Sequence, residues 1–291
     1  MDVKHHINAA DFLAHAGKFL AKDEVHYSLI MGIAKACVEN KYHYGPEAPW
    51  FCSVSADPKP MARLGSEMYA AAWRTPPYMV GLVYFSGSLD LLANELVTAV
   101  SRKYKEIPGV VGDKKLADIF AGRWCGRNGL KVNKTQVQKL FKLVKVNDVP
   151  LSPGKLRPAA VADTELVKKW SHGFFIDCFG EKSKVPESDL TLAIPHGDVF
   201  LWDVDGKPVS MAMKTRATDK GMSVGGVYTP PELRGKGYAT SCVAELSRNI
   251  LAGGKQFCTL YTDLANPTSN SIYKKIGYVE VADSVQHEFG K

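Results

Sequence analysis

Long apolar runs and a signal-like N-terminus are both missing from this chain of 291 residues. Every uninterrupted apolar run falls well short of the roughly 18 residues that a membrane-spanning helix needs, so we expect no membrane partner. Charged residues and histidines precede any apolar stretch at the N-terminus, which is not the pattern of a secretory signal. We therefore expect a cytoplasmic protein.

Paired cysteines and paired histidines are also missing. The six cysteines show no C-x-x-C spacing, so the sequence contains no zinc-ribbon or thioredoxin-like motif. Cys242 falls within a predicted helix and Cys258 within a predicted strand, which is typical of small buried residues in a reducing compartment. The eight histidines show neither H-x-H nor H-x-x-x-H spacing. We interpret the adjacent His5 and His6 as an exposed terminal pair, and we expect no metal site.

Charge of either sign is spread along the chain rather than clustered. Lysine and arginine exceed aspartate and glutamate by 37 to 30, which gives a net charge of +7. Spread charges indicate a solvated surface, so no nucleic-acid face is expected, although the excess would help to attract an acidic partner. Nothing in the composition decides whether the chain forms a homo-oligomer.

The most informative stretch is residues 224–239, VGGVYTPPELRGKGYA. It predicts a strand, a turn at Pro230-Pro231 and a glycine-rich loop that leads into a helix near position 237. The apolar residues of that helix recur at three- and four-residue spacing, at Val243, Leu246, Ile250 and Leu251. This spacing predicts one buried helix face.

The loop before this helix has the composition of a phosphate-binding site. Arg234, Gly235, Lys236 and Gly237 fall where a helix leaves its first amides unpaired. Glycines allow the backbone to approach an anion closely, and the helix dipole favours negative charge there. No Walker string G-x-x-x-x-G-K-[ST] occurs, and only the Gly235-x-Gly237 part of a Rossmann G-x-G-x-x-G is present.

Two motifs resemble the GCN5-related N-acetyltransferases (GNAT), which bind acetyl-CoA. Arg234-x-x-Gly237-x-Ala239 after a strand is similar to the pyrophosphate loop of that family. Further on, Asn266 follows a predicted strand and Tyr273 lies seven residues later, which resembles the second GNAT signature. Two motifs in the right order are more specific than either alone. The resemblance covers roughly residues 155–291 and is greatest to the FR47-like branch.

The resemblance implies acetyl-CoA as acyl donor, with its pantetheine arm paired to the strand backbone and its diphosphate on the loop amides. A main-chain N–H of the strand would polarise the thioester carbonyl. The cofactor-binding residues implied in this way are Val227, Tyr228, Thr229, Arg234, Gly235, Lys236, Gly237, Tyr238, Ala239, Thr240, Asn266 and Asn270.

Tyr273 is the candidate general acid. A phenol with a pKa of about 10 can protonate a departing thiolate, whose thiol has a pKa of about 8.5, while itself remaining neutral. The alternative is that Tyr273 only packs its helix against the sheet. The base is not identified, because residues 223–226 lack the glutamate that many relatives carry on this strand. Asp263 is a candidate base or a turn residue, and a water relay would also serve.

The order strand, helix, strand, helix, strand occurs twice, which predicts two related domains, residues 1–150 and 151–291. The linker is placed at 147–154, which contains two prolines, a serine and a glycine. In the first domain the segment equivalent to the loop, 86–91, has no arginine and carries Asp90, so we expect no CoA there. The fold class is therefore α/β with a mixed sheet, as two tandem GNAT-like folds of which the first is degenerate. The second has the predicted order β-α-α-β-β-β-α-β-α-β.

The leading hypothesis is an acetyl-CoA-dependent N-acetyltransferase that transfers an acetyl group to a primary amine of a small molecule or peptide by direct attack on the thioester. One alternative is an acyltransferase with another donor, such as aminoacyl-tRNA. Another is a non-catalytic CoA-binding or scaffold protein. The sequence does not identify the amine acceptor. Aromatic residues expected to line its cleft, or else to belong to the core, are Phe174, Phe175, Trp202 and Tyr228.

Overall fold

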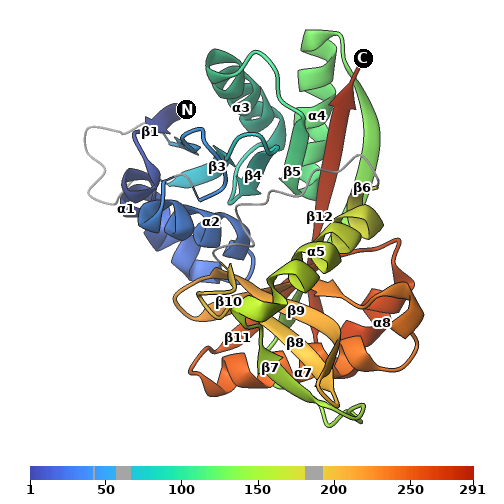
Figure 1. The fold of residues 1–291 in the computed structure, drawn as a ribbon. Helices are drawn as coiled ribbons and strands as arrows, with labels where there is room; N and C mark the ends of the chain where they lie inside the picture. Colours follow the sequence, from blue (N-terminus) through green and yellow to red (C-terminus); the bar gives the residue numbers. More distant parts are fainter. Residues whose placement is uncertain (42, 57–66, 181–192) are drawn as a thin grey trace. The chain divides into compact units, whose positions relative to one another are not determined.

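The computed structural model describes residues 1–41, 43–56, 67–180 and 193–291. These residues form two compact units (Figure 1). We call Met1–Leu140, Asp263–Ala265 and Ala282–Lys291 the N-terminal unit, and Phe141–Thr262 and Asn266–Val281 the C-terminal unit.

The N-terminal unit is built on a mixed sheet in which β1 to β4 are antiparallel neighbours, β4 and β5 are parallel, and β5 pairs with the last strand of the chain. Its strands are β1 (Asp2–His6), β2 (Trp50–Ser55), β3 (Met68–Arg74), β4 (Val80–Tyr84), β5 (Gly109–Asp113), and most of β6 (Lys131–Leu143) and of β12 (Val279–Gly290). Its helices are α1 (Ala9–Leu20), α2 (Ser28–Glu39), α3 (Leu89–Lys103) and α4 (Lys114–Asn128), with the 3-10 turn η1 (Ala21–Asp23) after α1.

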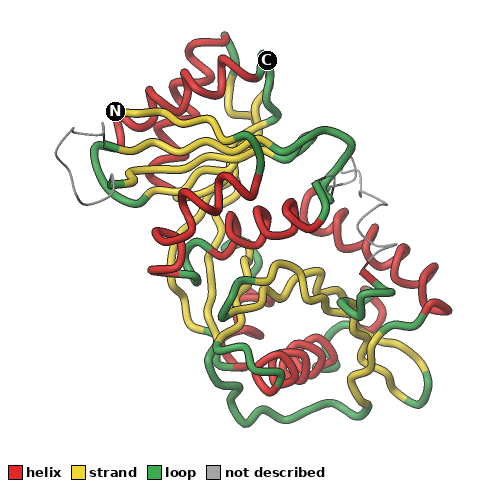
Figure 2. Tube along the Cα trace, turned by 90° about the vertical axis from the view of Figure 1, so that its left-hand side faces the viewer, coloured by secondary structure: helices red, strands yellow, loops and turns green. Residues whose placement is uncertain are grey.

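Helices cover both faces of this sheet (Figure 2). Successive side chains of a strand point to opposite faces, so one strand serves two cores. Trp50 and Cys52 of β2 pack in the cluster that contains α3 and α4, whereas Phe51 packs in the cluster that contains α1 and α2. Burial on both faces explains why β4 is a continuous apolar run.

The C-terminal unit repeats the same order of strand directions. Its strands lie in the order β6-β11-β10-β9-β8-β7, antiparallel from β7 to β10 and parallel between β10 and β11. They are β7 (Lys155–Pro158), β8 (Val199–Val204), β9 (Lys207–Ala217), β10 (Gly221–Tyr228), β11 (Phe257–Asp263) and the end of β6 (Lys131–Leu143). Its helices are α5 (Thr164–Phe179), α7 (Tyr238–Ala252) and α8 (Pro267–Ile276), with 3-10 turns η2 (Val161–Asp163) and η3 (Pro231–Leu233).

This unit also has two apolar clusters. The larger packs α7 and α8 against the sheet, with Val224, Cys242 and Tyr278 among its buried members. The smaller packs α5 against β8 and β9, around Val167 and Trp170. The predicted helix face of α7 is thus buried as its spacing indicated. Of the two helices predicted between the first two strands, α5 is observed, and residues 181–192 lie outside the described residues.

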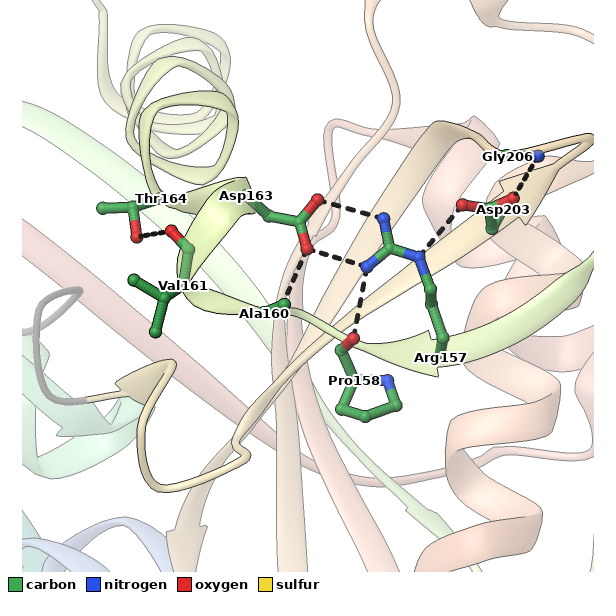
Figure 3. Close-up of polar contacts among 8 residues, drawn as sticks. All are labelled: Arg157, Pro158, Ala160, Val161, Asp163, Thr164, Asp203 and Gly206. Atoms are coloured by element: carbon green, nitrogen blue, oxygen red, sulfur yellow. Dashed lines mark hydrogen bonds and ion pairs between the residues drawn. The ribbon is translucent and has the colours of Figure 1, made fainter.

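Arg157 fixes the first strand of this unit to the start of α5 and to the β8–β9 hairpin (Figure 3). Its guanidinium donates to both carboxylate oxygens of Asp163, at 2.7 and 3.0 Å, and through Nε to Asp203 Oδ2 at 3.0 Å. Asp203 Oδ1 accepts from the Gly206 amide at the hairpin turn. Hydrogen bonding to Arg157 lowers the pKa of Asp163. A bidentate pair of this kind sets geometry as well as energy.

The C-terminal strand lies in the unit built by the beginning of the chain. Residues 284–288 of β12 pair antiparallel with residues 109–113 of β5. Ser284 Oγ donates to the Gly112 carbonyl at 3.0 Å, and His287 Nε2 lies 2.8 Å from Asp118 Oδ1 of α4. The two units therefore do not divide the chain at one point, because residues 282–291 return to the first unit.

The prediction that His5 and His6 form an exposed pair is wrong for His6. This side chain is buried, with Nδ1 3.1 Å from Asp11 Oδ2 and Nε2 2.9 Å from Ser53 Oγ. The reason is that β1 pairs with β2, which turns alternate side chains of the N-terminus into the core. No group of three or more metal-ligating side chains occurs in the described part of the chain. None of the described helices is long and apolar enough to cross a membrane.

Candidate functional site at the start of α7

Strand β10 leaves its parallel neighbour before it reaches the loop. Residues 221–223 pair with 257–259 of β11, and the register with β9 shifts between Gly225 and Tyr228. Gly226 has φ +56°, a left-handed conformation that glycine adopts at little cost. A bulge of this kind bends a strand and redirects its backbone groups. The last part of β10 thus extends beyond the β10–β11 ladder.

Two left-handed glycines shape the loop between β10 and α7. Gly235 has φ +78° and Gly237 has φ +79°. A Cβ atom at Gly235 would meet nothing within 4 Å, whereas one at Gly237 would lie 2.7 Å from Ser152 Oγ. Gly235 therefore faces open space, and Gly237 leaves room for a neighbouring side chain of the protein.

The start of α7 presents a run of amides without protein acceptors. The first backbone bond of the helix runs from the Ser241 N–H to the Gly237 carbonyl at 3.0 Å, and Gly237 supplies no capping side chain. Among the described residues, the N–H groups of 235–240 have no hydrogen-bond acceptor. Unpaired amides and the positive end of the helix dipole together favour an anion at this position.

Ser152 and Ser241, which the sequence analysis did not single out, hold the loop in this conformation. Ser152 Oγ donates to the Lys236 carbonyl at 2.6 Å, and the Ser152 N–H donates to Ser241 Oγ at 2.8 Å. Ser241 Oγ in turn donates to the Gly237 carbonyl at 3.2 Å. The segment predicted as a linker therefore supports the loop directly.

Within the described residues, the Arg234 side chain contacts Thr229, Asp177 and Tyr228. Its Nε donates to the Thr229 carbonyl at 2.9 Å, and Nη2 lies 2.5 Å from Asp177 Oδ2 of α5. Its guanidinium carbon is 5.8 Å from the centre of the Tyr228 ring. Both members of the ion pair are roughly half exposed. Lys236, by contrast, has an exposed side chain at the tip of the loop.

The end of β10 is held by Ser210. Ser210 Oγ donates to the Tyr228 carbonyl at 3.1 Å and lies 2.9 Å from Thr229 Oγ1. The Tyr228 ring lies 6.4 Å from that of Trp170. Burial raises the pKa of the Tyr228 phenol, Asp177 raises it further, and Arg234 acts in the opposite direction. The predicted residues Val227, Tyr228 and Thr229 thus lie together where the strand meets the loop.

The two predicted asparagines lie at the start of α8. Asn266 is the N-cap residue, and its Oδ1 accepts from the Ser269 N–H at 3.1 Å. Asn270 follows one turn later, and its N–H donates to the Asn266 carbonyl at 3.2 Å. A side-chain cap of this kind is typical of asparagine, so Asn266 has a structural role in the helix start.

Tyr273 points into the core of the C-terminal unit. Its ring packs against Tyr278 and Phe141, with centroids 5.9 and 6.3 Å away. Within the described residues its hydroxyl forms no hydrogen bond. Burial raises the pKa of the phenol, and the nearby Cys178 of α5 raises it further. The phenol therefore stays protonated near neutral pH, as a general acid must, while its ring also fills the core.

Among the described residues, a pair of hydroxyl groups from β10 and β11 stands where many relatives carry the strand glutamate. At that level of β10, Ser223 Oγ lies 2.9 Å from Thr259 Oγ1 in a buried pair. Asp263 was predicted to be either a base or a turn residue, and the structure shows it at the start of a turn. Its Oδ2 accepts from Gln136 Nε2 at 2.7 Å, and its Oδ1 accepts from the Ala265 N–H at 2.8 Å.

Trp202 does not line a cleft. It is 1% exposed, and its Nε1 donates to the Pro153 carbonyl at 3.0 Å, so of its two interpretations the core is the one observed. Phe174 and Phe175 of α5 are partly buried and contact each other edge to face. In the N-terminal unit, the start of α3 carries Asp90, whose Oδ1 accepts from Arg123 at 2.7 Å. An anion would meet a carboxylate at that helix start.

A comparison with known protein families finds one family that matches the part of the chain that carries this site. Residues 204–286 match the family model described as FR47-like protein. We call this segment the FR47-like domain, after the model that it matches. It runs from the β8–β9 turn through most of β12, and it contains every predicted cofactor-binding residue and Tyr273. Ser152 and Asp177, which contact its loop, lie outside it.

The FR47-like domain is part of a chain whose whole fold is found in solved structures. A Drosophila protein is 15% identical, with 98% of each chain covered and a TM-score of 0.68. A GCN5-related N-acetyltransferase from Sphaerobacter thermophilus is 14% identical, with 99% of this chain and 95% of that one covered and a TM-score of 0.58. A GNAT-family acetyltransferase from Colwellia psychrerythraea is 14% identical over 100% of both chains, with a TM-score of 0.56. No protein of curated function matches the sequence.

These structures share the fold, and the fold class predicted from the sequence, a mixed α/β sheet of GNAT type, is confirmed. The FR47-like domain carries the helix start at which the sequence predicted a phosphate site.

Proposed function

We propose that this protein is an N-acyltransferase that takes its acyl group from a coenzyme A thioester, with acetyl-CoA as the donor. The single observation that carries the proposal is the run of acceptor-free amides at residues 235–240, at the start of a 15-residue helix. Its fit to a diphosphate is supported by the open space beside Gly235 and by the exposed Lys236. Bound acetyl-CoA would supply an activated thioester carbonyl and a thiol leaving group.

The loop and the end of β10 would bind different parts of coenzyme A. The amides of 235–240 and the side chain of Lys236 would hold the diphosphate, because several N–H donors and a cation converge there. Backbone groups at Val227 and Thr229 would hold the pantetheine arm, since this part of β10 extends beyond its ladder with β11. Asn270 would add a contact from α8, whereas the Asn266 side-chain oxygen is already used as a helix cap.

Tyr273 would hold the proton that a departing thiolate needs. Its phenol is protonated near neutral pH, since burial raises a pKa that is ordinarily about 10, and its hydroxyl has no partner among the described residues that would compete for that proton. Removal of a proton from the attacking amine would fall to water and backbone carbonyls, because a buried serine–threonine pair stands where a carboxylate would serve as base.

The acceptor is proposed to be a primary amine of a small molecule or a peptide. A transfer of this kind needs the amine to reach the thioester carbonyl directly. At Gly225 and Gly226 β10 itself carries no side chain, and Thr215 and Met213 of β9 approach these positions. We also propose that residues 1–150 and 151–291 are tandem copies, of which the first no longer binds CoA, and that the protein acts in the cytoplasm.

Mass spectrometry of an amine library incubated with acetyl-CoA tests the activity, with calorimetric titration of CoA alongside. We expect CoA binding and at least one acetylated amine. Binding without any product would favour a non-catalytic CoA-binding protein, a second candidate that the absent strand carboxylate supports. No CoA binding would contradict both.

A further inference from the structure

We infer that Asp177 is the ion-pair partner of Arg234 in the cofactor-free protein, and that an incoming diphosphate replaces Asp177 in this role. Asp177 would then weaken cofactor binding, and cofactor binding would release the C-terminal end of α5. This inference rests on the proposed function, because it assigns a regulatory role to the same loop.

One nitrogen of the Arg234 guanidinium is held by a main-chain carbonyl, and another is held by a carboxylate that a second anion can replace. Nε is held by the main-chain carbonyl of Thr229, an acceptor that does not depend on the Thr229 side chain. Nη2 is held by the Asp177 carboxylate at 2.5 Å. The pair is exposed enough for solutes to reach both partners. Arg234 can therefore change its anionic partner while Thr229 keeps it at the loop.

Charge favours the exchange. Guanidinium groups bind carboxylates and phosphates by the same fork of donors, so Asp177 and a diphosphate compete for the same atoms. An exposed ion pair contributes little stability, so its loss is a small barrier to the exchange. A diphosphate also gains the amides of 235–240, which Asp177 on α5 does not contact.

The position of Asp177 on α5 explains why loss of the ion pair would release the end of this helix. It lies in the last turn of the helix, where the dipole disfavours a negative charge, and Arg234 offsets that charge. The next residue, Cys178, is close enough to Tyr273 to raise the pKa of its phenol. The end of α5 therefore contacts the loop that would bind the diphosphate and lies near the proposed acid.

Calorimetric titration of CoA with Asp177→Asn tests the inference. Removal of the competing carboxylate should tighten CoA binding about threefold at low salt, in line with an exposed ion pair, and the gain should shrink as salt screens the pair. Glu232→Gln is the matched control. It removes the same charge two positions before Arg234, at an exposed residue that forms no ion pair among the described residues. It should change affinity less than Asp177→Asn.

Arg234→Ala completes the cycle. In that background Asp177→Asn should give no gain, because the partner for which the two anions compete is absent. Asp177→Ala should increase CoA affinity as Asp177→Asn does. Agreement between the two variants attributes the gain to loss of the charge and not to the new asparagine amide. CoA binding by the wild type with unchanged or weaker binding by both Asp177 variants would overturn this inference alone. A wild type that binds no CoA would overturn the proposed function as well.

Discussion

Ser152 Oγ donates a hydrogen bond of 2.6 Å to the main-chain carbonyl of Lys236. This bond connects the segment that joins the two halves of the sequence to the loop that precedes α7. Because a peptide group has its N–H opposite its C=O, holding the Lys236 carbonyl toward Ser152 directs the N–H of Gly237 away from it. The loop amides therefore keep their orientation without a bound anion.

Replacement of Ser152 by alanine should weaken CoA binding. The lost bond is of the kind that contributes about 1 kcal/mol, which corresponds to roughly fivefold in affinity. Turnover at saturating acetyl-CoA should stay near the wild-type value, because the loop is far from the transferred group along the cofactor. Steady-state kinetics separate the two effects. Leu151→Ala, at the exposed neighbour, is the control and should leave both constants unchanged.

The two loop glycines should differ in their response to alanine. Both have φ near +80°, which costs an alanine about 1 kcal/mol, but only at Gly237 would the new Cβ also lie 2.7 Å from Ser152 Oγ. Gly237→Ala should therefore weaken CoA binding more than Gly235→Ala. Adding Ser152→Ala to Gly237→Ala should recover part of the loss, since it removes the clash. Equal effects at the two glycines would show that Ser152 does not shape the loop.

Tyr273→Phe should lower turnover at least tenfold, the lower part of the range for a general acid, and leave CoA affinity almost unchanged. It should also leave the free energy of unfolding near the wild-type value, because no protein hydrogen bond to the hydroxyl is present in the described residues. Tyr278→Phe is the matched control: its hydroxyl lies 2.9 Å from Ser247 Oγ in the core. That variant should lose about 1 kcal/mol of stability and keep its turnover. Wild-type turnover in Tyr273→Phe would leave Tyr273 with a packing role only.

Acid should destabilise the N-terminal unit through His6. Burial lowers the pKa of this imidazole to about 4, against the opposing effect of Asp11, with Lys4 and His15 also lowering it. Since the unfolded chain binds the proton more tightly, stability is lost as pH falls from about 6.5 to about 4, by about 3 kcal/mol in all.

Urea unfolding at pH 7 and pH 4.5 measures this loss, and His6→Gln should show a smaller difference between the two pH values. His196→Gln, at an exposed position, should keep the wild-type pH dependence. An identical pH dependence in His6→Gln and the wild type would contradict the assignment to His6.

Local patterns predicted the helices and strands around the site well. The helix predicted to begin near position 237 is α7, which begins at Tyr238, because its apolar spacing defines one buried face. β1, α1 and β3 were not predicted. α1 did carry a signal, since Asn8 caps it and Phe12, Ala16 and Leu20 recur every four residues.

Contacts between distant parts of the chain were beyond reach of the sequence. A last strand was predicted over 278–289, but its pairing with β5 joins residues 171 to 179 positions apart. Asp177 and Arg234 are separated by 57 positions, and Ser152 and Lys236 by 84. Nothing in local propensity or periodicity selects such partners. The residue types at the helix start could therefore be predicted, but the side chains that hold the loop could not.

The central claim is that the start of α7 binds the diphosphate of coenzyme A. Titration of CoA into isotope-labelled protein, followed by NMR of the backbone amides, tests it most directly. The account predicts that the largest shifts fall on residues 235–240, with little change at the equivalent start of α3. Shifts confined to other parts of the chain, or none at saturating CoA, would contradict it.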